Sequence, residues 1–186
     1  GGKLHLIGLC SDIGVHSLLG HLYGLLELAR RNDFDRVFLH ALTDGRDSPP
    51  TSGKGYIEEI EAKMKEIGVG KIASIMGRFF GMDRDQRWQR VEKAFQCIRF
   101  GKGKKAASAV QALQDSYDND KTDEFVEPVL IVEPDDTPTV IEDGDAVIFF
   151  NFRGDRPREI TRAFVDEHFT GFDRGPRPDV FYVCMT

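Results

Sequence analysis

Leu4-His5-Leu6-Ile7-Gly8-Leu9 is a short apolar run of the kind that forms a buried strand. The apolar residues after it recur at helical spacing from residue 18 to residue 29, and Ser17 stands where a helix cap is expected. Residues 36–42, Arg-Val-Phe-Leu-His-Ala-Leu, then form a second strand-like run. A strand, a helix and a strand in this order predict an α/β domain with a parallel sheet.

The same alternation continues along the chain. Helices are expected over residues 57–67, 88–98, 105–117 and 157–168, and strands over residues 71–76, 145–150 and 180–184. The stretches 125–133 and 139–151 are rich in β-formers, which favours some antiparallel pairing. The basic run 101–105 is interpreted as a connection between helices, because it lacks a phosphate-loop pattern. The predicted fold is α/β, with a mixed, largely parallel sheet flanked by helices.

Composition narrows the class of protein. The chain has 186 residues, a net charge of −6 and 40% hydrophobic residues, which suits one soluble globular domain. Its apolar runs are far shorter than the ~20 residues of a membrane span, and it has no apolar signal core. Cys10, Cys97 and Cys184 have no metal-ligand spacing and are interpreted as buried thiols. We therefore expect a cytoplasmic protein that binds neither membranes nor nucleic acid.

Polar loops follow the predicted strands at four places. Their sequences are Ser11-Asp12-Ile13-Gly14-Val15-His16-Ser17, Thr43-Asp44-Gly45-Arg46-Asp47-Ser48-Pro49-Pro50, Gly77-Arg78-Phe79-Phe80-Gly81-Met82-Asp83-Arg84-Asp85 and Asn151-Phe152-Arg153-Gly154-Asp155-Arg156. The carboxyl ends of parallel strands share one edge, where ligands of open α/β sheets bind. We expect these loops to bring together His16, Arg46, Arg78, Arg84, Arg153 and Arg156.

Several arginines on one rim of an acidic protein predict a site for a highly charged anion, such as a phosphorylated small acid. A guanidinium matches carboxylate and phosphate oxygens with two parallel hydrogen bonds. Any one of these arginines, taken alone, is better explained as a surface ion pair. Gly45 and Gly77 lie beside Arg46 and Arg78, where they would allow the backbone to approach a ligand closely.

Asp47 is the best candidate for proton transfer, because the neighbouring Arg46 favours its carboxylate form. The alternative is a cap of the turn before Pro49. His16 is expected to titrate near neutrality and to donate to an anion. Other acids of these loops, Asp12, Asp44, Asp83 and Asp85, suit Mg²⁺ in principle, but arginines interleave with them and favour salt bridges. The other histidines and Cys10 are interpreted as structural.

These loops, in this order, resemble the cofactor-independent (2,3-bisphosphoglycerate-independent) phosphoglycerate mutases. The matching stretches are residues 9–17, 44–50, 77–88, 122–125 and 149–156, and the resemblance covers essentially the whole chain. Ile13 stands where the family commonly has glycine, and Gly154 where it often has proline or another residue. Neither departure removes a charged group.

The resemblance implies an enzyme of glycolysis that interconverts 3-phosphoglycerate and 2-phosphoglycerate. Residues 1–186 would be its inserted substrate-binding (phosphotransferase) domain, with a mixed sheet that can curl toward a barrel. His16, Arg46, Asp47, Arg78 and Arg84 would hold the glycerate, and Arg153 and Arg156 the phosphoryl group. Asp47 would move the hydroxyl proton. Two Mn²⁺ ions and a serine nucleophile would belong to an alkaline-phosphatase-like domain absent from this chain, and this domain would be the chain's partner in cis.

Two other hypotheses stay open at this level. One is a stand-alone binding module for small phosphorylated acids, without chemistry of its own. The other is a self-contained Mg²⁺ phosphohydrolase that uses Asp12 or Asp44. Strands at both ends of the chain suit a domain inserted into, or cut from, a larger chain. We expect the isolated chain to lack mutase activity.

Overall fold

The structure, a computed structural model, describes residues 2–132 and 136–186. Its elements in chain order are β1 (Leu4–Leu9), α1 (Leu19–Arg31), β2 (Val37–Thr43), α2 (Gly53–Ile67), β3 (Lys71–Gly77), α3 (Arg78–Gly81), α4 (Trp88–Phe100), β4 (Lys104–Ala106), α5 (Ala109–Asp118), the 3-10 helix η1 (Asp123–Phe125), β5 (Val129–Ile131), β6 (Ala146–Phe149), α6 (Arg158–Val165) and β7 (Phe181–Cys184). None of the helices in the described residues is long and apolar enough to cross a membrane.

The described strands form one seven-stranded sheet in the order β4-β5-β3-β2-β1-β6-β7. All neighbours are parallel except β5, which runs antiparallel to β3. The predicted mixed, largely parallel sheet is therefore confirmed. The sheet stays open with β4 and β7 at its edges, so the curling that the resemblance allowed does not close a barrel.

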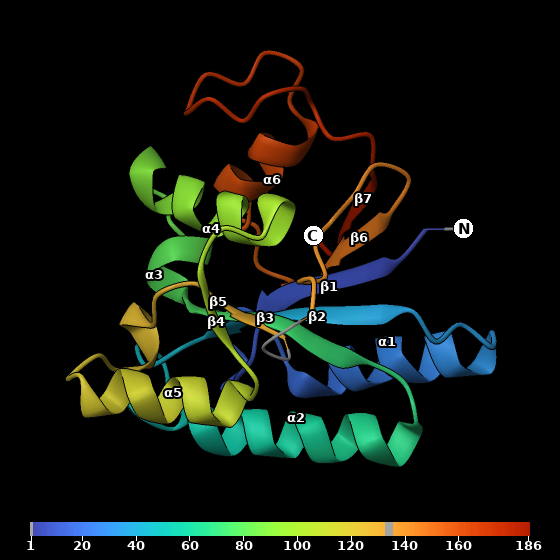
Figure 1. Ribbon diagram of the computed structural model, residues 1–186, viewed down its shortest axis with the longest axis vertical. Helices are drawn as coiled ribbons and strands as arrows, with labels where there is room; N and C mark the ends of the chain where they lie inside the picture. The colour runs from blue at the N-terminus through green and yellow to red at the C-terminus, as the bar shows by residue number, and fades with distance from the viewer. Residues whose placement is uncertain (1, 133–135) are drawn as a thin grey trace.

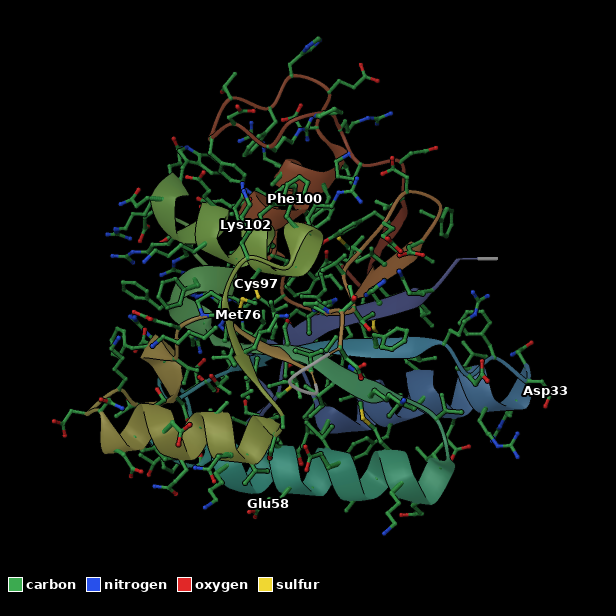
Figure 2. The ribbon with its side chains drawn as sticks, viewed as in Figure 1. Asp33, Glu58, Met76, Cys97, Phe100 and Lys102 are labelled. Atoms are coloured by element: carbon green, nitrogen blue, oxygen red, sulfur yellow. The ribbon has the colours of Figure 1, made fainter. Side chains whose placement is uncertain are left out.

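Helices cover both faces of the sheet (Figure 1). On one face α1, α2 and α5 bury a core that includes Leu22, Leu26 and Ile60. On the other, α4 and α6 bury a second core that includes Phe95 and Phe164. Figure 2 labels Met76 of β3 and Cys97 of α4, which belong to this second core, and Glu58 on the exposed side of α2. Burial on both faces explains why the strands are nearly continuous apolar runs.

Three local expectations were wrong. Ser17 does not cap α1; its hydroxyl donates to the carbonyl of Leu9, and the cap position is Leu18. The basic run 101–105 does not merely connect helices, because Lys104–Ala106 forms the edge strand β4 beside β5. Residues 78–81 form the short helix α3 within what was expected to be a loop. Residue 133, the last of the β-rich stretch 125–133, lies outside the described residues.

Candidate functional site: an arginine cluster at the carboxyl edge of the sheet

The polar loops share one edge of the sheet, as expected. β3, β2, β1 and β6 are adjacent and parallel, and their ends are in register: Thr43 pairs with Gly77, Leu9 with Leu42. Each strand therefore releases its loop at the same edge (Figure 1). The side chains on these loops make contact with one another, as the distances below show.

Arg78 is the centre of the site. It begins α3 directly after β3, and only 2% of it is exposed. Its Nη1 donates to Oδ1 of Asp44 and to Oδ2 of Asp47, both at 2.6 Å. Its Nη2 lies 3.0 Å from Nε2 of His16. Burial acts to lower the pKa of Arg78, but the two carboxylates outweigh it and raise the pKa. One buried cation therefore joins three loops.

Asp44 holds the loop that carries Arg46 and Asp47. Its Oδ1 accepts hydrogen bonds from the backbone N–H groups of Arg46 (3.2 Å) and Asp47 (3.0 Å), and its Oδ2 accepts one from Ser11 (2.9 Å). Burial opposes its ionised form, but these bonds and Arg78 lower its pKa overall. Asp44 is thus an arginine partner and a turn-forming residue, which leaves it poorly suited to act as a phosphohydrolase nucleophile. The capping of the turn before Pro49, which was the alternative role for Asp47, is therefore performed by Asp44.

Asp47 is oriented by Arg78 and not by its neighbour in sequence. The Arg46 side chain turns toward Glu124 (Nη1 to Oε1, 3.4 Å). Oδ2 of Asp47 accepts from Arg78 and lies 3.6 Å from Nε2 of His16. The Asp47 side chain is 25% exposed, so solvent or a ligand can reach it.

His16 is neutral at physiological pH, contrary to the expectation that it titrates near neutrality. Burial, followed by the charges of Arg78 and Arg153, lowers its pKa from 6.5 to about 4. A guanidinium can only donate, so Nε2 of His16 accepts from Arg78. In a neutral imidazole the proton is then on Nδ1.

The remaining arginines surround this centre. Arg84 and Arg153 both donate to Oδ2 of Asp155, at 2.8 and 3.0 Å. Arg156 donates to the neutral carbonyl of Met82 at 3.0 Å. Its pKa is lowered by burial and then by the charges of Arg78, Arg84 and Arg46. Crowding of like charges around Arg156 creates a surplus of positive charge, which favours an anion there.

The segment around η1 is the scaffold of the site. A Cβ on Gly77 would lie 2.1 Å from the carbonyl oxygen of Glu124, and one on Gly53 would lie 2.6 Å from Oδ1 of Asp123. Gly45 has a φ of +66° and also abuts Asp123. Gly45 and Gly77 were expected to let the backbone approach a ligand. Instead they make room for the segment around η1.

Asp123 completes the scaffold from a fully buried position. It accepts hydrogen bonds from the backbone N–H of Gly53 (2.7 Å) and from the Tyr117 hydroxyl. Its backbone carbonyl accepts from Thr43 (2.7 Å). Sequence reasoning missed the parts played by Asp123, Glu124 and Asp155. Asp155 had a visible signal, since it stands between Arg153 and Arg156.

The remaining candidates from the sequence, which are Cys10 and the acids Asp12, Asp83 and Asp85, show no sign of a catalytic or metal-binding role. Burial raises the pKa of Cys10 to about 12, so its thiol is unreactive. Asp83 contacts Arg87 and Arg90 at 3.5 Å, and Asp85 contacts Arg87. Asp12 is exposed. The described residues contain no group of three or more His, Cys, Asp or Glu side chains that could hold a metal ion.

Two hollows of about 370 and 570 Å³ flank β4, away from the arginine cluster. Both include Lys104 and Glu127. Glu127 pairs with Lys121 at 2.8 Å and lies 3.7 Å from Lys104, and these lysines lower its pKa. Glu127 therefore partly neutralises the basic charge there.

Comparison with known proteins gives consistent results. A family model described as "BPG-independent PGAM N-terminus" matches residues 1–186. The 2,3-bisphosphoglycerate-independent phosphoglycerate mutases of Moorella thermoacetica and Clostridium perfringens are 51% and 56% identical, over 100% and 99% of this chain but 36% of each relative. A crystal structure of Leishmania mexicana phosphoglycerate mutase at low cobalt concentration matches with a TM-score of 0.95 and 42% identity, over 100% of this chain and 35% of that one.

Proposed function

Since the chain belongs to the family of N-terminal parts of BPG-independent phosphoglycerate mutases, we propose that it is the substrate-binding domain of such an enzyme. The whole protein would interconvert 3-phosphoglycerate and 2-phosphoglycerate, in glycolysis and in the cytoplasm. The observation that carries this proposal is the cluster of arginines around a neutral, buried His16. Arg78 contacts His16 directly, and Arg84 and Arg153 pair with Asp155 beside it. Such a cluster matches a ligand with both a carboxylate and a phosphate.

The proposed division of roles follows the family motifs. His16, Arg46, Asp47, Arg78 and Arg84 would hold the glycerate, and Arg153 and Arg156 the phosphoryl group. The surplus positive charge around Arg156 supports its assignment to the more highly charged end of the ligand. Arg78 would act from a fixed position, because two carboxylates already orient it.

Asp47 would accept the proton of a substrate hydroxyl. Its Oδ2 is held by Arg78, which orients the carboxylate, and its side chain remains reachable from solvent. A neutral His16 beside it carries no positive charge; its Nε2 accepts from Arg78, which leaves Nδ1–H as its donor. Proton transfer on this chain is therefore assigned to the carboxylate and positioning to the imidazole.

The metal ions of the proposed enzyme, two Mn²⁺, do not fit the residues described in this chain. Cobalt is named for the Leishmania mexicana relative, which supports metal use by the family. Here, however, the acids at the site are occupied by arginines and backbone N–H groups. This chain covers 36% of the length of its relatives. We propose that the metal ligands and the serine nucleophile lie in the rest of the longer protein. There the metal would supply positive charge to the transferring phosphoryl group.

A calorimetric titration of the chain with 3-phosphoglycerate, without metal, tests the proposal. We expect saturable binding that is lost in Arg46→Ala and retained in Arg30→Ala. Arg30 is a matched control, because it is an exposed arginine on α1 whose ion-pair partner is Asp33. Equal binding by all three proteins would contradict the proposal, as would an affinity that does not distinguish 3-phosphoglycerate from glycerate.

A further inference from the structure

Two buried polar atoms in the site face each other without forming a hydrogen bond. Nδ1 of His16 and Oδ1 of Asp155 are 3.9 Å apart, and neither has a hydrogen-bond partner. Because Nε2 of His16 accepts from Arg78, Nδ1 bears a proton and is a donor. Oδ1 of a carboxylate is an acceptor. The two groups are complementary, and native proteins rarely leave such groups unpaired when buried.

The other oxygen of Asp155 explains the gap. Oδ2 accepts hydrogen bonds from Arg84 (2.8 Å) and from Arg153 (3.0 Å). Burial acts to raise the pKa of Asp155, but these arginines lower it overall, so the group is a carboxylate. Two guanidiniums thus hold the carboxylate out of reach of the imidazole. Both belong to the arginines assigned to the ligand.

We propose that Asp155 is an exchangeable counter-ion of the site. An incoming phosphorylated acid takes over Arg84 and Arg153, and the released Asp155 carboxylate moves to accept a hydrogen bond from Nδ1 of His16. This inference rests on the proposed function for the identity of the ligand. Asp155 is then a positioning residue that couples occupancy of the arginines to the orientation of the histidine.

The environment of His16 makes this exchange measurable. The groups that face it are Arg78 of α3, Asp47 of the loop after β2, and Arg153 and Asp155 of the loop after β6. Arg78 and Arg153 lower its pKa, while Asp155 and Asp47 raise it. A closer Asp155 must therefore raise the pKa of His16 from its value of about 4.

The first experiment needs no ligand. Nitrogen-15 NMR follows the His16 ring in the wild-type chain and in Arg84→Gln, which removes one guanidinium from Asp155 and leaves Arg78 and Arg153 in place. We expect the pKa of His16 to rise by about one unit. Adding Asp155→Asn to Arg84→Gln should cancel the rise. An unchanged His16 pKa in Arg84→Gln would overturn the exchange.

The second experiment adds the ligand. In calorimetry with 3-phosphoglycerate, and with inorganic phosphate as a simpler probe, Asp155→Asn should bind several-fold more tightly, because it no longer competes for the arginines. In the longer enzyme the same variant should show a lower KM together with a lower kcat. Asp85→Asn is the control. It makes the same charge change on the loop that carries Arg84, but the Asp85 carboxylate pairs with Arg87 and not with Arg84 or Arg153.

The outcomes separate the two proposals. Weaker binding or a higher KM in Asp155→Asn would show a merely structural role and overturn the exchange. If the wild-type chain binds neither probe while the His16 pKa responds as expected in Arg84→Gln, the proposed ligand is wrong and the exchange of Asp155 stands.

Discussion

At the scale of single residues, Arg78 and Arg46 are expected to contribute very differently to stability, although both belong to the candidate site. Arg78 is buried and paired with two carboxylates at 2.6 Å, whereas the Arg46 side chain is 56% exposed. Removing a buried ionic partner leaves the other charge unpaired and desolvated. An exposed ion pair contributes little, because water and salt screen it.

We therefore expect Arg78→Met to lower the free energy of unfolding by about 3–5 kcal/mol. Arg46→Ala should lower it by less than about 1 kcal/mol while abolishing 3-phosphoglycerate binding. Urea unfolding of the two variants and the wild type measures both effects. Similar losses of stability in the two variants would show that the buried ion pairs of Arg78 do not stabilise the fold more than the exposed pair of Arg46.

At the scale of elements, a buried hydrogen-bond chain joins the strands on the face covered by α4 and α6. Ser74 of β3 contacts Nδ1 of His40 on β2 at 2.8 Å, and Nε2 of His40 contacts Nδ1 of His5 on β1 at 2.9 Å. Nε2 of His5 contacts Asp145, just before β6, at 3.1 Å. All the bonds are satisfied when both histidines are neutral and each donates through Nε2 toward Asp145.

These buried histidines make the stability of the protein depend on pH. Burial lowers the pKa of His5 from 6.5 to about 4, and it lowers the pKa of His40 as well. Between these values the unfolded chain binds more protons than the folded chain. The contribution of these neutral histidines to the free energy of unfolding is therefore complete above pH 6.5 and is lost as the pH falls toward 4. His5 alone accounts for about 3 kcal/mol of this loss.

Urea unfolding at pH 7.5 and at pH 4.5 should show this loss. His5→Asn should lower stability at pH 7.5 and also reduce the difference between the two pH values. His168→Gln, at an exposed position, should leave the difference unchanged. A pH difference that His5→Asn does not reduce would assign the effect to other groups, such as His16.

The contact between β3 and η1 gives a second prediction at this scale. A Cβ on Gly77 would lie 2.1 Å from backbone oxygen, which cannot move aside as a side chain can. We expect Gly77→Ala to destabilise the chain by about 2–3 kcal/mol. Gly55→Ala is the matched control: it lies inside α2, meets nothing within 4 Å, and should stabilise by about 0.5–1 kcal/mol. Equal unfolding curves for the two variants would exclude the proposed scaffold.

At the scale of the whole molecule, this chain has an arginine cluster that we propose as a binding site but, in its described residues, no metal-binding cluster. We expect it to show no mutase turnover by itself, with or without added Mn²⁺, in an assay coupled to enolase. The longer enzyme that we propose contains this chain should turn over in a metal-dependent way. Manganese-dependent turnover by the isolated chain would contradict this division, and release of inorganic phosphate would support a self-contained phosphohydrolase instead.

Much of the fold and the location of the site follow from the sequence alone. The helical and strand periodicities of residues 4–42 are local properties, set by which side chains must face a core. The parallel order then places the loops after β1, β2, β3 and β6 at one edge, because parallel strands all end on the same side. The strand β4 escaped prediction because its Lys-Lys-Ala sequence has no apolar alternation, and only pairing with β5 makes it a strand.

The interior of the site was decided by tertiary structure. The sequence predicted that His16 titrates near neutrality, but burial and the charges of Arg78 and Arg153 lower its pKa and keep it neutral. Asp47 is adjacent to Arg46 in the chain yet is held by Arg78, 31 residues away. The glycines at 45, 53 and 77 make room for a segment that lies at residues 122–125. A pKa, a choice of ion-pair partner and a close backbone contact all depend on neighbours distant in sequence. The sequence therefore determined which loops after β1, β2, β3 and β6 meet at this edge, and only folding decided the charge states and partners of their residues.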